Sequence, residues 1–266
     1  MDGFKLFIKR DEEDGEAAEV LVDGFLENHP YRFLLDTGAA KSSVLHDDYT
    51  AQLNPVGQGE TSRSVFGEDV PTLVSVPRLE LGSVVKENFT LARAAKGSPA
   101  AHNLIGMDVL KDFCCHFRFD KGEVLIGPAE ENPDQALFLD DRSHPYVDVH
   151  FGEVSAKAVW DTGAGITAAH TGFIEAHPNL FERVGHLSGT DGSGISVKTP
   201  VFRMADARIG GRAFSPHKVV GIDLSWANET LEVPMDLLLG YSTLGQANWL
   251  FDFPAKRWAV TKLLDG

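Results

Sequence analysis

The residues best suited to do chemistry are two aspartates, each at the start of the same four-residue stretch. Residues 36–39 read Asp-Thr-Gly-Ala, and residues 161–164 repeat them. Each copy directly follows an apolar run, FLL in the first case and AVW in the second. One isolated Asp-Thr-Gly is normally a turn, in which Asp accepts backbone N–H groups and Gly takes a positive φ. Two copies at the ends of two buried strands can instead form a pair of facing carboxylates.

A pair of carboxylates can do chemistry that one carboxylate cannot. Like charges about 3 Å apart cannot both ionise, so at working pH the pair shares one proton. The ionised member acts as a general base on a bound water, and the protonated member polarises a carbonyl group. Water then attacks directly, without a covalent intermediate. Because the titration belongs to the pair, the sequence does not assign the proton to Asp36 or to Asp161.

The chain around the two turns is also repeated. A shift of 125 positions (161 − 36) aligns the turns, and the same shift aligns Gly67 with Gly192. Further on, a shift of 134 (238 − 104) aligns LIGMDVL at 104–110 with LLGYSTL at 238–244. Self-similarity over this length indicates an internal duplication.

The duplication divides the chain into two lobes. Residues 127–143 are rich in Pro, acidic and amide residues, which is typical of a linker. We therefore place an N-terminal lobe that carries Asp36 at 1–127, a linker at 128–143 and a C-terminal lobe that carries Asp161 at 144–266.

The local patterns predict mostly strands. Apolar runs broken by polar turns predict hairpins, and the second strand of the first hairpin in each lobe ends at the aspartate. The stretches GMDVLKDF at 106–113 and GYSTLGQA at 240–247 are the best candidates for helices. The adjacent Cys114 and Cys115 are expected as core residues on a strand. The fold class is therefore mainly β, with one or two short helices in each lobe.

The repeated turns resemble those of the aspartic proteases, the pepsin and retroviral-protease superfamily. That family carries Asp-Thr/Ser-Gly followed by two hydrophobic residues and a glycine, once in each half. Here the second element is LIG at 104–106 and LLG at 238–240. The resemblance covers nearly the whole chain. It implies a bilobal acid-protease fold, with double-psi or closed β-barrel-like lobes related by a pseudo-twofold axis.

The resemblance also implies roles for individual residues. Asp36 and Asp161 would be the catalytic pair of an aspartic endopeptidase, and Thr37 and Thr162 would hydrogen-bond across the lobe interface. The glycines of the turns would let the two backbones approach each other. The other implied supporting residues are Gly38, Ala39, Gly163 and Ala164 in the turns, with Gly106 and Gly240 as structural glycines.

The residue after each turn glycine differs from the pepsin pattern. Pepsin-like chains usually carry a hydroxyl residue there, whereas Ala39 and Ala164 match the retroviral proteases. Without the hydroxyl, the ionised carboxylate loses one stabilising hydrogen bond, so the dyad should titrate at a higher pH. We expect an optimum at weakly acidic to neutral pH.

Each lobe also has a glycine-containing turn 31 residues after its aspartate (67 − 36 and 192 − 161). We expect these turns, SVFGED and GTDGSG, to be two flaps over the substrate. Clusters of Gly, Asp and Ser also mark ordinary hairpin tips, which is the alternative. The expected flap residues are Phe66, in the place of the pepsin tyrosine, with Gly67, Asp191 and Gly192.

Charge and composition disfavour some classes of partner, whereas the peptide or protein substrate is what the resemblance implies. With 39 acidic and 24 basic residues the net charge is −15, which disfavours nucleic acid and anionic membranes as partners. No apolar run is long enough to span a membrane, and the acidic N-terminus does not resemble a signal peptide. We expect a cytoplasmic protein, or a periplasmic or secreted one if a leader was removed. The ten histidines lack metal-site spacing, so we expect no metal and no cofactor.

Three functions remain open at this point. The leading hypothesis is a monomeric, single-chain endopeptidase that binds an extended peptide between its lobes by strand pairing. The alternative is a catalytically silent peptide-binding module of the same fold, against which the presence of both carboxylates argues. A third possibility is a processing enzyme that cuts only itself or one partner.

Overall fold

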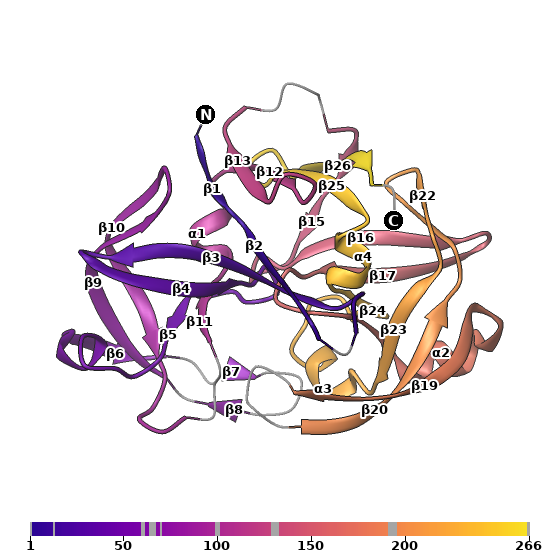
Figure 1. The fold of residues 1–266 in the computed structure, drawn as a ribbon, viewed down its shortest axis with the longest axis horizontal. Coiled ribbons are helices and arrows are strands. Elements are labelled where there is room, and N and C mark those ends of the chain that lie inside the picture. Colours follow the sequence, from indigo (N-terminus) through magenta and orange to yellow (C-terminus); the bar gives the residue numbers. More distant parts are fainter. Residues whose placement is uncertain are drawn as a thin grey trace.

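The computed structural model of the protein describes residues 2–12, 14–59, 62–63, 68–69, 71–98, 102–128, 133–190 and 196–264. Figure 1 shows two lobes side by side, the N-terminal half in one and most of the C-terminal half in the other. Both lobes are built mostly of strands. The prediction of a mainly β, two-lobed fold with few short helices is confirmed.

The N-terminal lobe is a closed ring of strands. The ring runs in the order β3 (Ala18–Leu26), β4 (His29–Leu35), β11 (Asn103–Ile105), β5 (Ser43–Val44), β10 (Val84–Arg93) and β9 (Thr72–Leu81). β4 runs parallel to β11, and β9 closes the ring by pairing with β3. Two further strands extend the sheet: β2 (Phe7–Arg10) and β6 (Pro55–Gln58).

The C-terminal lobe repeats this order of strands. The corresponding strands are β16 (Pro145–Phe151), β17 (Val154–Trp160), β24 (Leu237–Leu239), β18 (Thr167–His170), β23 (His217–Ile222) and β20 (Ser196–Met204). β17 runs parallel to β24, as β4 does to β11. Here β16 pairs with β21 instead of β20, so the described strands do not close a ring. The remaining strands of this sheet are β15 (Phe138–Leu139), β19 (Phe181–Thr190), β21 (Ala207–Ile209) and β22 (Arg212–Phe214).

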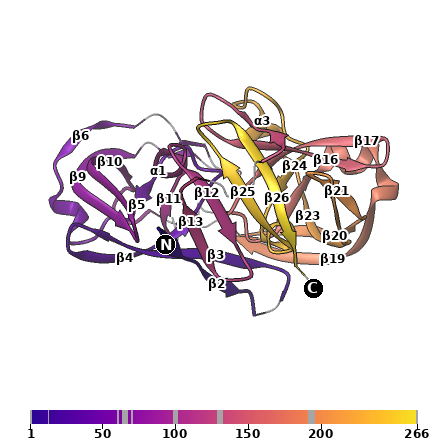
Figure 2. The same cartoon turned by 90° about the horizontal axis from the view of Figure 1, so that it is seen from above.

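A third sheet joins the two halves of the chain. Its strands are β1 (Gly3–Lys5), β13 (Glu123–Ile126), β12 (Cys114–Arg118), β25 (Ala247–Asp252), β26 (Arg257–Leu263) and β14 (Gln135–Ala136). β12 from the first half pairs antiparallel with β25 from the second, with Phe117 opposite Trp249. Figure 2 shows these strands between the lobes. The predicted linker is therefore partly stranded, because β14 and β15 both lie within it.

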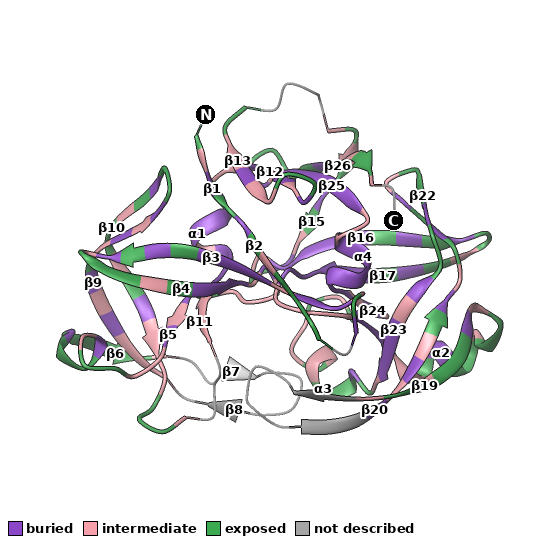
Figure 3. Ribbon diagram, in the orientation of Figure 1, coloured by how far each residue is buried: buried purple, intermediate pink, exposed green. Residues whose placement is uncertain are grey.

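Aromatic side chains fill the core beneath this sheet. Phe117, Trp160 and Phe251 are fully buried, and the Trp160 ring centroid lies 4.7 Å from that of Phe117 and 4.6 Å from that of Phe251. Cys115 is buried and Cys114 is half-buried on β12, as expected for core cysteines. Burial of each large apolar side chain stabilises the folded state by roughly 1.5–3 kcal/mol relative to leaving it exposed. Figure 3 shows buried residues concentrated on the inner strands and on two short helices, α1 and α4.

The helices are short. α1 (Met107–Leu110) and α4 (Tyr241–Leu244) lie where the sequence predicts them, directly after Gly106 and Gly240. The C-terminal lobe also contains α2 (Thr171–Ala176) and α3 (Ser225–Asn228), which the sequence analysis did not predict. The described residues also include two single 3₁₀ turns, η1 (Thr50–Gln52) and η2 (Pro178–Leu180). Within the described residues, none of these helices has the length and apolar character of a membrane span.

Candidate active site

Two buried strands deliver the aspartates. β4 ends at Leu35 and β17 ends at Trp160, and both of these residues are fully buried. The N–H of Asp36 donates a hydrogen bond to the carbonyl of Ile105 at 2.9 Å, and the N–H of Asp161 donates to that of Leu239 at 3.0 Å. Each aspartate is therefore fixed through its backbone to the parallel neighbouring strand, at the end of a buried ladder.

Thr37 and Thr162 connect the two turns across the lobe interface. The N–H of Thr37 donates to Oγ1 of Thr162 at 3.2 Å, and the N–H of Thr162 donates to Oγ1 of Thr37 at 3.0 Å. The Thr37 hydroxyl donates to the carbonyl of Trp160 at 2.8 Å, and the Thr162 hydroxyl donates to that of Leu35 at 2.7 Å. Both threonines are buried. Each one therefore fixes the end of the strand that carries the other aspartate.

Gly38 and Gly163 bring each backbone turn against the opposite carboxylate. A Cβ atom on Gly38 would lie 2.7 Å from Oδ2 of Asp161, and one on Gly163 would lie 2.6 Å from Oδ1 of Asp36. Both distances are shorter than real Cβ contacts. The N–H of Gly38 donates to Oδ1 of Asp161 in the opposite turn at 3.1 Å, and the N–H of Gly163 donates to the same oxygen from within its own turn at 2.7 Å.

The two carboxyl groups interact directly and titrate as a pair. Burial raises the pKa of Asp36 well above its ordinary value, and the charge of Asp161 and a hydrogen bond to it raise that pKa further. Burial also raises the pKa of Asp161 above its ordinary value, although hydrogen bonds from the N–H of Gly163 and from Asp36 offset part of this increase. The N–H of Gly38 and the charge of His144 offset a further part. The site therefore favours one shared proton, the state required for general acid–base chemistry.

The predicted structural glycines pack against the ends of the turns. A Cβ atom on Gly106 would lie 2.7 Å from the carbonyl oxygen of Ala39, and one on Gly240 would lie 2.6 Å from that of Ala164. Both positions therefore require a residue without a side chain. The carbonyl oxygens of the two alanines accept equivalent hydrogen bonds in the two lobes, from the N–H of Met107 at 2.8 Å and from that of Tyr241 at 2.9 Å.

Ser42 and Thr167 support the site, and the sequence analysis missed both. Oγ of Ser42 accepts a hydrogen bond from the N–H of Gly106 at 3.0 Å and donates one to Asp108 at 2.6 Å. Oγ1 of Thr167 accepts from the N–H of Gly240 at 3.0 Å. These two residues are related by the same 125-residue shift as the aspartates (167 − 42). Alignment of the two halves of the chain at this shift therefore pairs the two hydroxyl residues.

The predicted flap tips lie outside the described residues. They are Phe66, Gly67, Asp191 and Gly192. On either side of the first tip, β7 (Ser62–Arg63) pairs antiparallel with β8 (Glu68–Asp69). On either side of the second, β19 pairs antiparallel with β20. Figure 1 shows these strand ends at the same edge of the molecule.

A protein-family model matches the N-terminal part of the chain. Residues 22–112 match the model of a family described as "gag-polyprotein putative aspartyl protease". This segment is similar to aspartyl proteases. The aspartyl-protease-like segment contains the first Asp-Thr-Gly-Ala turn and Gly106, but not the second turn. No curated protein matches the chain.

Among the residues that the structure describes, no group of three or more His, Cys, Asp or Glu side chains is arranged to hold a metal ion.

Proposed function

We propose that the protein is an aspartic endopeptidase of the retropepsin-like or pepsin-like type that hydrolyses peptide bonds with Asp36 and Asp161. The observation that carries this proposal is the reciprocal packing of the site. Each carboxyl group lies against the glycine of the opposite turn, and the threonines between the turns hold this arrangement. The match of residues 22–112 to an aspartyl protease family also supports it.

In this mechanism one carboxyl group acts as the general base and the other as the general acid. The ionised carboxylate removes a proton from a water molecule as the oxygen of that water attacks the peptide carbonyl carbon. The protonated carboxyl group donates its proton to the carbonyl oxygen, which yields a neutral tetrahedral intermediate. Collapse of the intermediate breaks the C–N bond. The carboxyl that received the water proton passes it to the leaving amine, and a hydroxyl of the intermediate returns a proton to the other carboxylate as the product carboxyl group forms. Both carboxyl groups end the cycle with one proton between them.

The lobes would supply the binding site. An extended peptide lying between the N-terminal lobe (1–127) and the C-terminal lobe (144–266) could pair with strands of the two flaps, and its alternate side chains would enter pockets. Both aspartates come from one chain, so the proposed enzyme needs no second copy and acts as a monomer. Its substrate is a peptide or an unfolded protein segment.

A silent peptide-binding module is the less favoured function. A protein that only bound peptides would gain nothing from two buried carboxyl groups in contact, because burial of each disfavours its charged form. The site keeps both groups despite this unfavourable contribution.

The decisive experiment is incubation with an unfolded protein and with a mixed peptide library from pH 3 to 8. The wild-type protein is compared with Asp36→Asn and Asp161→Asn, and with Asp206→Asn as the control, since Asp206 is exposed and on the surface. We expect the wild type and the control to cut the same bonds, and both site variants to be inactive. If the wild type and the site variants leave the same peptides uncut, the protein is not a peptidase.

A further inference from the structure

A buried histidine of the C-terminal lobe is connected to the second Asp-Thr-Gly-Ala turn by a chain of hydrogen bonds. His217 lies on β23 and is 4% exposed. Its Nε2 lies 2.6 Å from Oγ1 of Thr243 on α4, and that oxygen lies 2.6 Å from Oγ1 of Thr167. Both threonines are fully buried. Thr167 accepts the N–H of Gly240 at 3.0 Å, so the chain ends at the glycine that packs against the second turn.

The partners of the His217 ring fix the direction of every hydrogen bond in this chain. Nδ1 lies 2.7 Å from the carbonyl oxygen of Ser215, which can only accept, so Nδ1 carries a hydrogen. In the neutral ring Nε2 then has no hydrogen and accepts the hydroxyl of Thr243. The single hydroxyl hydrogen of Thr243 is used in this bond, so its oxygen accepts the hydroxyl of Thr167. The oxygen of Thr167 in turn accepts the N–H of Gly240.

Protonation of His217 would reverse two bonds of this chain. Nε2 would then donate to Thr243, whose hydroxyl would donate to Thr167 instead of accepting from it. The hydroxyl hydrogen of Thr167 would be left with the carbonyl oxygen of Gly240, at 3.4 Å. That oxygen already accepts the N–H of Thr243 at 2.9 Å and that of Leu244 at 3.0 Å. The charged ring therefore weakens the hydrogen bonds that hold Thr167.

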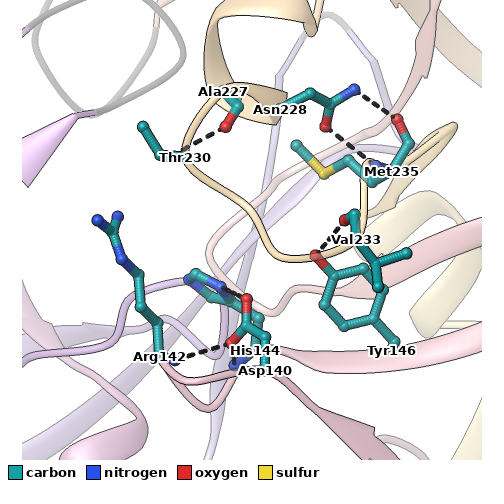
Figure 4. Close-up of polar contacts among 9 residues, drawn as sticks. All are labelled: Asp140, Arg142, His144, Tyr146, Ala227, Asn228, Thr230, Val233 and Met235. Atoms are coloured by element: carbon teal, nitrogen blue, oxygen red, sulfur yellow. Dashed lines mark hydrogen bonds and ion pairs between the residues drawn. The ribbon is translucent and has the colours of Figure 1, made fainter.

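The charge of a protonated His217 would also lack a compensating carboxylate. Figure 4 shows another buried histidine of the same lobe, His144, whose Nδ1 lies 2.7 Å from Oδ2 of Asp140. Among the residues that the structure describes, His217 forms no such ion pair. Burial lowers the pKa of His217 below its ordinary value, and the hydrogen bond to the carbonyl of Ser215 offsets part of this decrease. An imidazolium at this position is therefore unfavourable in the folded protein.

Two charges act on the His217 ring in opposite directions. Glu16, in the loop before β3, raises the pKa of the ring, and Arg203 on β20 lowers it. Lys218, the next residue of β23, directs its Nζ to Oδ1 of Asp14 at 3.0 Å. Burial is the largest contribution to the pKa of His217, and these charges act in addition to it.

The other elements that pack against β23 bring no charge to the ring. On α4 the titratable residue is Tyr241, whose pKa is raised by burial, so it is neutral at working pH. On β18 the titratable residue is His170, which lies opposite Ile222, five residues along β23. α2 meets β23 at Gly221, and the acidic residue of this helix, Glu175, is exposed.

The N-terminal lobe has apolar residues at both equivalent positions. The shift of 134 that relates the two glycines also relates Thr243 to Val109 (243 − 134), which is buried. β23 pairs with β18 as β10 pairs with β5, and these registers relate His217 to Phe89, which packs against the core. The ionisable chain of hydrogen bonds is therefore a feature of the second half-site.

We propose that His217 is a positioning residue for the second turn, acting through Thr243 and Thr167, and that it holds this turn only while its ring is neutral. Acid then weakens the support of Gly240 and, through it, of the turn that carries Asp161. His217 does not touch the substrate. The inference rests on the proposed endopeptidase function and deepens it, because it adds an acid limit to activity that does not come from the two carboxyl groups.

The first test determines which ring nitrogen carries the hydrogen. Two-bond ¹H–¹⁵N correlations of the full chain, labelled with ¹⁵N in the histidine rings, distinguish the neutral tautomers from the imidazolium, and the spectrum of His217→Gln identifies the signals of His217. We expect a neutral ring with its hydrogen on Nδ1 at pH 7.5. A hydrogen on Nε2, alone or in addition, would overturn the deduced direction of the chain.

The second test compares the Tm of the wild type and of His217→Gln from pH 7.5 to 4.5. Glutamine can accept the hydroxyl of Thr243 but cannot ionise. The folded state lowers the pKa of His217, so its contribution to stability is complete above the unfolded pKa near 6.5 and is lost as the pH falls through the folded pKa. The Tm of the wild type should fall at least about 3 °C further than that of His217→Gln, as for one pKa unit in a chain of this size.

The control for this comparison is His150→Gln, which changes an exposed histidine on β16. Its Tm should follow that of the wild type over the whole pH range. Equal losses of Tm in the wild type and in His217→Gln would show that the ring does not hold the turn in a charge-dependent way, and the inference would be wrong.

The third test breaks the chain at its middle member. Thr243→Val keeps the shape of the side chain but removes the hydroxyl, and kcat/KM should fall about tenfold or more because the second turn loses its support. Thr243→Ser restores the hydroxyl and should restore the rate. The acidic limb of the kcat/KM profile should also extend to lower pH in His217→Gln than in the wild type. A Thr243→Val enzyme with wild-type kcat/KM would refute the positioning role.

A double variant keeps this test decisive if Thr243→Val does not fold. His217→Phe/Thr243→Val carries the residue types that the N-terminal lobe has at these positions and leaves no ring nitrogen unpaired. It should recover Tm relative to Thr243→Val, since removing both partners of a buried hydrogen bond costs less than removing one. Its Tm should also lack the additional acid-dependent loss of the wild type.

These measurements separate the inference from the proposed function. The NMR spectra and the Tm values require no substrate, so a wild type that cuts no peptide but shows the Nδ1 hydrogen and the additional loss of Tm refutes the peptidase and keeps the acid-sensitive support of the turn. A wild type that cuts peptides with the same acidic limb as His217→Gln and the same rate as Thr243→Val keeps the function and refutes the role of His217.

Discussion

Thr37 and Thr162 exchange hydrogen bonds across the interface between the two lobes, each backbone N–H bonding to the hydroxyl of the other residue at 3.2 and 3.0 Å. The same hydroxyls donate to the carbonyl oxygens of the last residues of the opposing strands. One side chain therefore satisfies two buried backbone groups that lie in the other lobe. The relative position of the two aspartates depends on these reciprocal hydrogen bonds, because they link the ends of the two strands that carry the aspartates.

Substituting either threonine by valine should destabilise the fold strongly. Thr37→Val keeps the volume but leaves the N–H of Thr162 and the carbonyl of Trp160 unpaired, at about 1–3 kcal/mol for each buried group. Thr162→Val should lower the free energy of unfolding by a similar amount. The double variant should lose less than the sum of the two single losses, because the two side chains take part in the same hydrogen bonds. Urea unfolding measures these differences. The control is Thr90→Val on an exposed position of β10, which should change stability by less than about 0.5 kcal/mol. Equal stabilities of the three single variants would contradict this account.

Adding a methyl group at Gly163 should disable the site. Its Cβ would lie 2.6 Å from Oδ1 of Asp36, so the turn or the carboxyl group has to move. We expect Gly163→Ala to reduce kcat/KM at least about 100-fold, since displacements near 1 Å in a catalytic geometry have effects of this size. Gly185→Ala is the matched control, because no atom lies within 4 Å of the added Cβ. A Gly163 variant that retains wild-type activity would show that the carboxyl group tolerates the displacement.

The parts of the site that obey the internal repeat could be predicted from the sequence. The aspartates, the turn glycines and Gly106 and Gly240 recur at fixed shifts. The aspartates supply the carboxyl groups, and the glycines stand where the structure has no room for a side chain. Ser42 and Thr167 are related by the same shift as the aspartates but differ in residue type, so the comparison of the two halves did not identify them.

The elements that were not predicted are those that depend on distant parts of the chain. β14 and β15 each have only two residues and exist because they pair with β26 and β16. α2 and α3, with six and four residues, are too short to show a helical period in the sequence. The closed ring of the first lobe depends on the contact of β9 with β3, which no local pattern specifies.

Replacing Asp36 by asparagine should stabilise the protein at neutral pH. The folded state raises the pKa of Asp36, so it binds this proton more tightly than the unfolded chain does. Stability due to this group is then complete below the unfolded pKa, near 4, and is lost as the pH rises through the folded pKa. Asp36→Asn should therefore match the wild type at pH 3.5 and exceed its Tm by several degrees at pH 8. Asp206→Asn, on the surface, should follow the wild type throughout. A constant offset across this range would argue against a raised pKa.

Restoring a hydroxyl beside each carboxyl group should move the activity towards acid pH. Ala39 and Ala164 follow the turn glycines and are half-buried. A serine hydroxyl that donates to an ionised carboxylate stabilises the charged form, so the acidic limb of the kcat/KM profile should move down by about 0.5–1 unit in Ala39→Ser/Ala164→Ser. Ala213→Ser, exposed on β22, should leave the profile unchanged. The wild type itself should work best at weakly acidic to neutral pH. A wild-type optimum below about pH 3.5, where ordinary carboxyl groups are mostly protonated, would refute the role given to the two alanines.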